Sequence, residues 1–267
     1  MEPGKLIGKG MTAEVYLCEN NKVLKLFFKK FGRDRVTYEA DIGFKIHQTG
    51  VPSPAVYGVV EVNDRHGIVF EHIYGKTILE QIEHQSWLIS YFSKQMAATH
   101  FDIHSFTEGN LPSQKKLLAD AINLSSDINV TNKNRILSYL QSLPEGNSVC
   151  HGDLHFDNII VSDGRLIPID WKNACKGNPM GDVARTCMTI RSPTLPFGRL
   201  ELYVMPYLYG KFFTYKEYLS EYMSLAKVNF ESIDEWTLPV AAARLSEKIP
   251  GEKEWLMDIV QDYLDKL

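Results

Sequence analysis

Short apolar runs separated by polar turns fill residues 1–73 and predict an antiparallel β-sheet. The expected strands cover 15–18, 23–27, 56–62 and 68–71, with turns at 19–22 and 63–67. Residues 34–48 interrupt this pattern with apolar positions at helical spacing, and we expect a helix with Asp34 as its N-cap. Beyond residue 73 helical spacing dominates, and helices are expected at 77–84, 87–104, 113–123, 132–143, 198–227, 231–248 and 251–267.

Residues 159–169 break the helical pattern and predict a β-hairpin, because two apolar runs flank a turn that contains an Asp-Gly pair. Pro168 in the return strand predicts a sheet edge or a bulge, since proline donates no ladder hydrogen bond. A hairpin brings its two ends together. We therefore expect Asn158 and Asp170 to be neighbours.

The chemistry of the chain is concentrated around this hairpin. Residues 151–158 read His-Gly-Asp-Leu-His-Phe-Asp-Asn, and Asp170 follows twelve residues after Asn158. The set Asp153, Asn158 and Asp170 suits phosphoryl transfer, in which one carboxylate orients a hydroxyl and accepts its proton while the other carboxylate and the amide hold Mg²⁺. The alternative is a solvated polar loop between strands.

The amino-terminal strands carry a second set of candidate residues. Gly8 and Gly10 belong to a glycine-containing turn whose backbone N–H groups could approach phosphate. Lys25 lies in an apolar strand, where an unpaired charge would be costly. Glu39 flanks the apolar stripe of the following helix and could supply its partner. The alternatives are an ordinary hairpin turn and a solvent-facing glutamate.

These motifs, in this order, resemble the aminoglycoside phosphotransferase and choline kinase branch of the protein-kinase-like superfamily. The resemblance implies a two-lobed α+β fold. Residues 1–73 would form an ATP-binding lobe, a small antiparallel sheet with one helix and a Gly-rich loop. Residues 74–267 would form a larger, mainly helical lobe for catalysis and substrate binding.

The resemblance also implies a role for each matching residue and a pair of cofactors, ATP (or GTP) and Mg²⁺. Asp153 would be the catalytic residue, and Asn158 and Asp170 would bind the metal. The nucleotide would be bound by Gly8, Gly10 and Lys25 at the phosphates, with Glu39 holding Lys25, by Glu71 and Ile73 in a hinge at the adenine edge, and by Val15, Val23, Ile160 and Ile169 at the adenine ring. His151 and Asp182 would support the catalytic loop. For Asp182, a plain helix N-cap is the alternative.

Departures from the protein-kinase pattern favour a small-molecule kinase. Ala13 replaces a glycine, and His155 stands where protein kinases carry a lysine. Trp171 follows Asp170, so the chain has no Asp-Phe-Gly, and it has no Ala-Pro-Glu element. We expect an ATP-dependent phosphotransferase, similar to aminoglycoside phosphotransferases, that acts on a hydroxyl group. The alternatives are a kinase for choline, homoserine or a sugar, and a nucleotide-binding pseudokinase.

Composition agrees with a cytoplasmic enzyme. The 267 residues carry a formal net charge of −4, which gives no reason to expect nucleic acid or an anionic membrane as a partner. The start of the chain has no signal-peptide pattern, and no apolar run approaches the ~18 residues of a membrane span. The four cysteines show no zinc or disulfide spacing.

The charge of the C-terminal region bears on the charge of the acceptor. Residues 231–267 hold nine acidic and four basic residues, and aminoglycosides and choline are cations. We therefore expect an acceptor that is cationic or amine-bearing, with Asp234, Glu235 and the aromatic face of Trp236 as candidate contacts. The alternative is that these acids lie on solvated helix faces.

Overall fold

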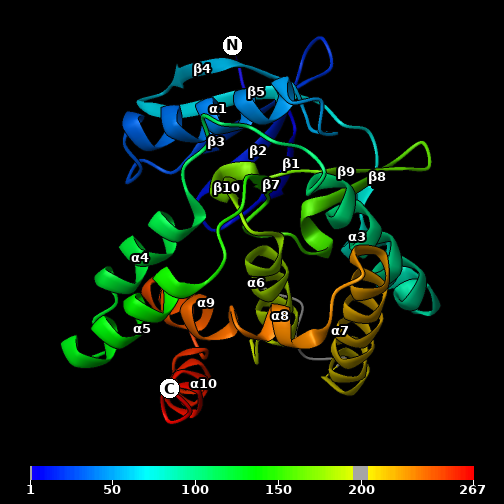
Figure 1. Ribbon diagram of the computed structural model, residues 1–267. Coiled ribbons are helices and arrows are strands. Elements are labelled where there is room, and N and C mark those ends of the chain that lie inside the picture. The colour runs from blue at the N-terminus through cyan, green and yellow to red at the C-terminus, as the bar shows by residue number, and fades with distance from the viewer. Residues whose placement is uncertain (1, 195–203) are drawn as a thin grey trace. The chain divides into compact units, whose positions relative to one another are not determined.

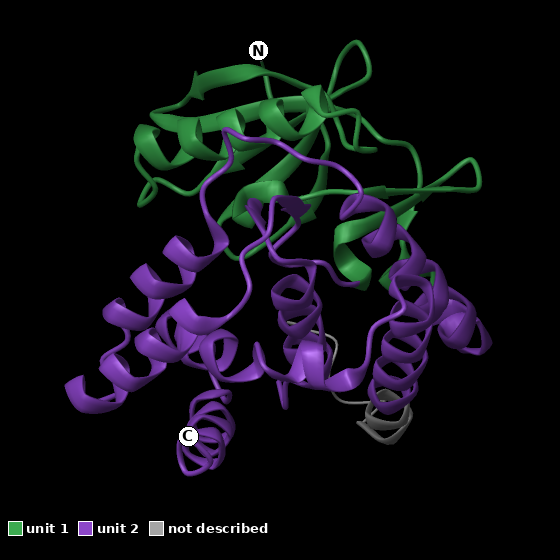
Figure 2. Ribbon diagram, viewed as in Figure 1, with its two compact units in different colours: residues 1–81, 156–174 green, residues 82–155, 175–267 purple. Residues whose placement is uncertain are grey.

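The computed structural model describes residues 2–194 and 204–267, which form two compact units. Unit 1 comprises residues 1–81 and 156–174, and unit 2 comprises 82–155 and 175–267 (Figure 2). The expected α+β fold is confirmed, with an antiparallel sheet lobe and a helical lobe. The division into a nucleotide lobe ending at residue 73 and a catalytic lobe from 74 stays a prediction.

The main sheet of unit 1 is antiparallel, with the strand order β1-β2-β3-β5-β4 (Figure 1). Its strands are β1 (Leu6–Lys9), β2 (Ala13–Cys18), β3 (Lys22–Phe27), β4 (Val56–Val62) and β5 (Arg65–Glu71). The expected strands are confirmed, and β1 adds an edge strand. The turn expected at 63–67 is shorter, because Asn63 and Asp64 take left-handed backbone angles (φ 50° and 58°) and reverse the chain in two residues.

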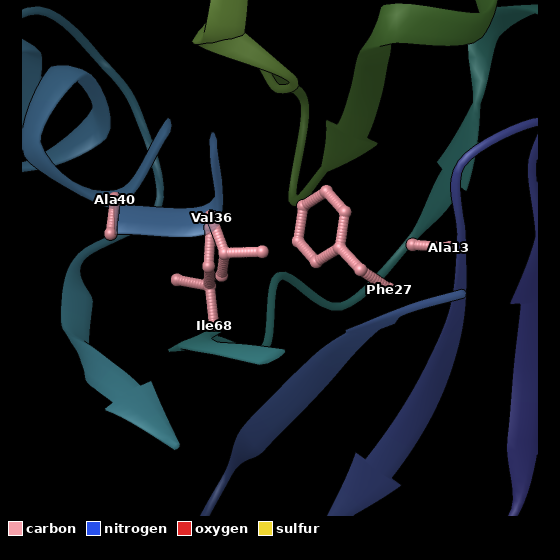
Figure 3. Close-up of a cluster of buried hydrophobic side chains, with 5 residues drawn as sticks. All are labelled: Ala13, Phe27, Val36, Ala40 and Ile68. Carbon is pink, nitrogen blue, oxygen red and sulfur yellow. The ribbon is translucent and has the colours of Figure 1, made fainter. Parts of the chain in front are cut away.

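Helix α1 (Arg33–Gln48) covers one face of this sheet. Val36 and Ala40 from the helix meet Phe27 of β3 and Ile68 of β5 in a buried cluster (Figure 3). The expected Asp34 cap is wrong: the N-cap is Gly32, whose backbone is extended, so the helix begins earlier and Asp34 lies in its first turn. An acidic residue there still favours the helix dipole.

A three-stranded sheet completes unit 1. It consists of β6 (Lys76–Thr77), β8 (Ile159–Ser162) and β9 (Arg165–Pro168), in the order β6-β8-β9. The predicted hairpin is therefore confirmed. Its two-residue turn has left-handed angles at Asp163 (φ 48°) and Gly164 (φ 75°), as an Asp-Gly turn requires. Pro168 lies on an edge strand, as expected, and pairs with Ile159.

Unit 2 is mainly helical. It contains the last turn of α2 (Ile78–His84), then α3 (Ile89–Ile103), α4 (Gln114–Leu124), α5 (Val130–Ser142), α6 (Pro179–Arg191), α7 (Val204–Ala226), α8 (Phe230–Asp234), α9 (Thr237–Arg244) and α10 (Lys253–Leu264). Helices α3 and α7 run side by side (Figure 1). A two-stranded sheet pairs β7 (Ser148–Cys150) with β10 (Cys175–Gly177).

Two predicted helices of unit 2, at 198–227 and 231–248, have different bounds from those expected. The single helix expected at 231–248 is wrong, because the chain turns at Glu235–Trp236 between α8 and α9 to bury Trp236, which is 1% exposed. The helix expected at 198–227 corresponds to α7, and its expected first residues lie outside the described ranges. Within residues 2–194 and 204–267, no helix combines the length and apolar character that crossing a membrane requires.

Replacing Phe27 with alanine tests the cluster between α1 and the sheet. Phe27 is 1% exposed, so Phe27→Ala should lower the free energy of unfolding by about 3–5 kcal/mol through lost burial and a residual cavity. Phe44→Ala is the matched control, because Phe44 of the same unit is 50% exposed. Urea denaturation measures both; equal losses would show that the cluster is not the core of unit 1.

Candidate active site

Three charged groups of unit 1 meet at Lys25. Its Nζ lies 2.6 Å from Oε1 of Glu39 and 2.8 Å from Oδ1 of Asp170. The expected ion pair with Glu39 is thus present, and Asp170 joins it. The side chains of Lys25 and Glu39 are 16% and 6% exposed, so both charges depend on each other for compensation.

The pKa values of these groups follow from that pairing. Burial alone would lower the pKa of Lys25, but the carboxylates of Asp170 and Glu39 outweigh burial and raise the pKa above its usual value. Burial alone would raise the pKa of Asp170, but the ammonium groups of Lys25 and Lys172 hold it well below its usual value. Lys25 and Asp170 are therefore both charged at neutral pH.

Asp170 has two features that the sequence did not predict. Its backbone is left-handed (φ 61°, ψ 56°), which is costly for a residue other than glycine and is often found at functional sites. Its Oδ2 lies 2.7 Å from Nζ of Lys172, two residues further along the chain. The carboxylate therefore has an ammonium group on each oxygen, which favours its ionised form.

The hairpin places Asn158 beside the end of β9, since the N–H of Ile169 donates to the carbonyl of Asn158 at 2.9 Å. The prediction that Asn158 and Asp170 are neighbours in the fold is confirmed to that extent. Asn158 is buried and Asp170 is partly buried. An amide oxygen and a carboxylate are hard donors, so this pair fits Mg²⁺ in its chemistry.

The other candidate nucleotide residues of unit 1 lie on its main sheet or on the three-stranded sheet. Val15 pairs directly with Lys25, and Val23 lies two residues before it, so all three share one face. Gly8 pairs with Val15 at the end of β1, and the N–H of Gly10 donates to the carbonyl of Ala13. The remaining candidates lie at strand ends or in the hairpin: Glu71 closes β5, Ile73 follows it, Ile160 is in β8, and Ile169 follows β9.

Gly8 and Gly10 are not required by the fold itself. Neither is among the residues with a left-handed backbone. A Cβ atom at Gly8 would come no closer than 3.6 Å to Val15, and one at Gly10 no closer than 3.8 Å to the carbonyl oxygen of Ala13. Both are ordinary contact distances, so the backbone would tolerate side chains at these positions.

In unit 2 the catalytic-loop candidate follows β7 and is fixed by Asp182 of α6. The N–H groups of His151 and Gly152 donate to the two oxygens of Asp182 at 2.6 and 2.8 Å. The N–H of Asp153 donates to Nδ1 of the buried His151 at 3.3 Å. The N-cap alternative for Asp182 is excluded, since Asn178 caps α6.

A pair of histidines completes the environment of Asp182 and was not predicted. Nε2 of His100 and of His104 lie 2.9 and 3.3 Å from Oδ2 of Asp182, and their Nδ1 atoms lie 2.6 Å from the hydroxyls of Tyr218 and Tyr222. Burial lowers the pKa of His104 to about 4, so this ring is neutral at pH 7. The available signal was the spacing of four residues between the histidines, which places them on one helix face.

The candidate acceptor residues do not form the expected cation site. Trp236 is 1% exposed, so the cation–π contact expected at its face is wrong: the ring is core. Oδ1 of Asp234 accepts hydrogen bonds from the hydroxyls of Tyr263 and Thr237. Glu235 is exposed on the surface between α8 and α9. The remaining support for a cationic acceptor is the excess of acidic residues in 231–267.

Comparison with known proteins identifies the class. The model of the phosphotransferase enzyme family matches residues 3–204, and the chain belongs to this family. It is therefore a phosphotransferase with a kinase-like fold. A search of curated protein sequences gave no match.

Solved structures share the fold at low sequence identity. A thermostable mutant of aminoglycoside phosphotransferase APH(4)-Ia gives a TM-score of 0.64 at 14% identity, covering 98% of this chain and 94% of the other. Aminoglycoside-3'-phosphotransferase of type VIII gives 0.59 at 16% identity, covering 90% and 91%. The streptomycin–ATP–APH(2")-IIa ternary complex gives 0.54 at 17% identity, covering 98% and 90%.

Variants at Lys25 and Glu39 test their pairing. Lys25→Met and Glu39→Gln should each lower phosphoryl transfer by roughly 10²-fold, because either change leaves the other group mispositioned. The double variant should lie within about threefold of the worse single variant, since both act through one contact. Lys22→Met, in the same strand, is the control. Losses that multiply would contradict the pairing.

Magnesium titrations test the proposed metal ligands. Asp170→Ala should weaken Mg²⁺-dependent ATP binding at least about tenfold and more than Asn158→Ala does, because a carboxylate is the stronger ligand for a hard cation. Calorimetric titration of ATP at stepped Mg²⁺ concentrations measures this. The exposed Asp157 supplies the control, Asp157→Ala. Small and equal effects of Asp170→Ala and Asn158→Ala would argue against a metal site at the hairpin.

Proposed function

We propose that the protein transfers the γ-phosphate of ATP, or of GTP, to a hydroxyl group of a small molecule. The observation that carries the proposal is the buried Lys25 held between Glu39 and Asp170. A lysine with two carboxylate partners in an apolar sheet is costly to maintain for stability alone, whereas a fixed ammonium group is what phosphate binding needs.

The nucleotide would lie against the sheet face that carries Val15, Val23 and Lys25. Side chains of Val15 and Val23 are half-buried on that face and suit an apolar ring. Gly8 and Gly10, which the fold does not require, would leave room for phosphate near their backbone N–H groups. The solved APH(2")-IIa structure, which shares the fold, is a ternary complex with streptomycin and ATP.

Asn158 and Asp170 would hold Mg²⁺, which neutralises charge on the phosphates when bound. Asp153 would orient the acceptor hydroxyl and take its proton as the oxygen attacks the γ-phosphate. His151 and Asp182 would hold the loop that carries Asp153. Because each residue that the chemistry needs is present, an enzyme is favoured over a nucleotide-binding pseudokinase.

The acceptor is a small hydroxylated molecule, and a cytoplasmic setting fits this chemistry. An assay of ADP formation against a panel identifies it: aminoglycosides and choline as cations, homoserine as a zwitterion, and sugars as neutral acceptors. The acidic C-terminal helices lead us to expect turnover with a cationic member. Turnover with neutral or anionic acceptors alone would overturn that choice, and no turnover together with no ATP binding would overturn the function itself.

Asp153→Ala should abolish transfer and spare nucleotide binding. Asp153 is the proposed base, whereas Lys25, Asn158 and Asp170 are the proposed phosphate and metal ligands, so the variant removes the base and keeps the side chains of those ligands. The rate should fall roughly 10²-fold or more, the scale of a positioned base. Asp258→Ala, an exposed change on α10, is the control. Near-normal turnover by Asp153→Ala would disprove the assignment.

A further inference from the structure

Arg185 of α6 contacts Asp153, the proposed catalytic base, and the sequence did not predict a role for this arginine. Its Nη2 lies 3.4 Å from Oδ1 of Asp153. Arg185 follows Asp182 by three residues, about one helical turn, so both side chains leave α6 on the side of the same loop. Asp182 fixes the loop backbone, and Arg185 contacts the Asp153 carboxylate of the same loop.

The guanidinium group of Arg185 is itself held in place. Nη1 donates to Oε1 of Glu247 at 2.5 Å, and Nη2 donates to Oε2 at 3.0 Å, which is a bidentate pair. The side chain of Arg185 is 12% exposed. Burial alone would lower the pKa of Arg185, but the carboxylates of Glu247 and Asp153 outweigh burial and raise it. The group is therefore a fixed positive charge.

Glu247 has a second partner, so it does not depend on Arg185 alone. Nη1 of Arg244 lies 3.7 Å from Oε2 of Glu247, and Arg244 forms a buried bidentate pair with Glu252 at 2.6 and 2.7 Å. Charges of alternating sign therefore run from Asp153 through Arg185, Glu247 and Arg244 to Glu252. Removing the Arg185 charge leaves Glu247 partly exposed and still beside a guanidinium group, which favours survival of the fold.

We propose that Arg185 is a positioning residue for the reaction: clamped by Glu247, it fixes the rotation of the Asp153 carboxylate and holds a positive charge beside it for the incoming hydroxyl. This inference rests on the proposed function, because it needs Asp153 to be the base. If Arg185 only linked α6 to the 3₁₀ turn Leu245–Glu247 (η4) for stability, its replacement would have no effect on the titration of Asp153.

The test compares Arg185→Gln, Arg185→Lys and Glu247→Gln with the wild type, with Glu254→Gln as an exposed control. For each protein, kcat and KM are measured with an acceptor found in the panel, together with the Kd of Mg-ATP and the dependence of kcat on pH. The charged or titratable groups near Asp153 in its unit include Arg185, Glu247 behind it, His151 in the loop, and Asp182 beneath the loop backbone.

Arg185→Gln should lower kcat about 10- to 100-fold, while KM for the acceptor and the Kd of Mg-ATP stay within about threefold of wild type. The acid limb of its kcat profile should move to higher pH, because a nearby cation normally lowers the pKa of a carboxylate. Arg185→Lys keeps the charge, so its acid limb should stay near that of the wild type while kcat falls. Glu247→Gln should lower kcat less than Arg185→Gln.

Wild-type kcat and an unmoved acid limb in Arg185→Gln would overturn the inference. If Arg185→Gln loses cooperative unfolding, Arg185→Lys and Glu247→Gln decide: reduced kcat at unchanged KM supports the inference, and wild-type kcat in both overturns it. Failure of the proposed function looks different, because the wild type itself would then bind no Mg-ATP or transfer phosphate to no acceptor.

Discussion

The buried charge of Lys25 is the constraint on which unit 1 depends. Its two carboxylate partners come from α1 and from the end of β9, so three distant segments must meet at one ammonium group. Removing one member of such a buried pair typically costs about 3–5 kcal/mol, whereas apolar replacement of the whole set often costs nothing. Stability alone does not explain the arrangement. The proposed role of Lys25 as a fixed cation for phosphate would explain it, and the left-handed backbone of Asp170 is a strain often found at functional sites.

Unit 2 is organised around a buried charge of opposite sign. Asp182 is 1% exposed, and its oxygens receive two loop N–H groups and face two histidine rings. Burial alone would raise the pKa of Asp182, but contacts with His100 and His104 hold it well below the usual value. The carboxylate thus stays ionised and binds the loop that carries Asp153. Each unit therefore stabilises a charge with several polar partners, and in the proposed function each of these charges would position one part of the chemistry.

The sequence predicted what local rules determine. The Asp-Gly hairpin, the apolar strands and the meeting of Asn158 with the end of β9 follow from patterns a few residues long. The pairing of Lys25 with Glu39 was reached through the resemblance, since nothing local fixes which helix face meets the strand. Contacts between distant side chains were missed, among them Arg185 with Asp153, because their register depends on tertiary packing. Burial of Trp236 was missed for the same reason: a break between α8 and α9 turns the ring into the core.

Hydrogen exchange of the wild-type protein, with and without Mg²⁺ and a non-hydrolysable ATP analogue, tests the central claim most directly. That claim is that unit 1 holds the nucleotide and its metal around Lys25. The account predicts new amide protection within residues 7–15, 23–27, 71–75 and 158–172, and it predicts that this protection requires Mg²⁺. Protection that leaves these segments unchanged, or that is the same without Mg²⁺, would contradict it.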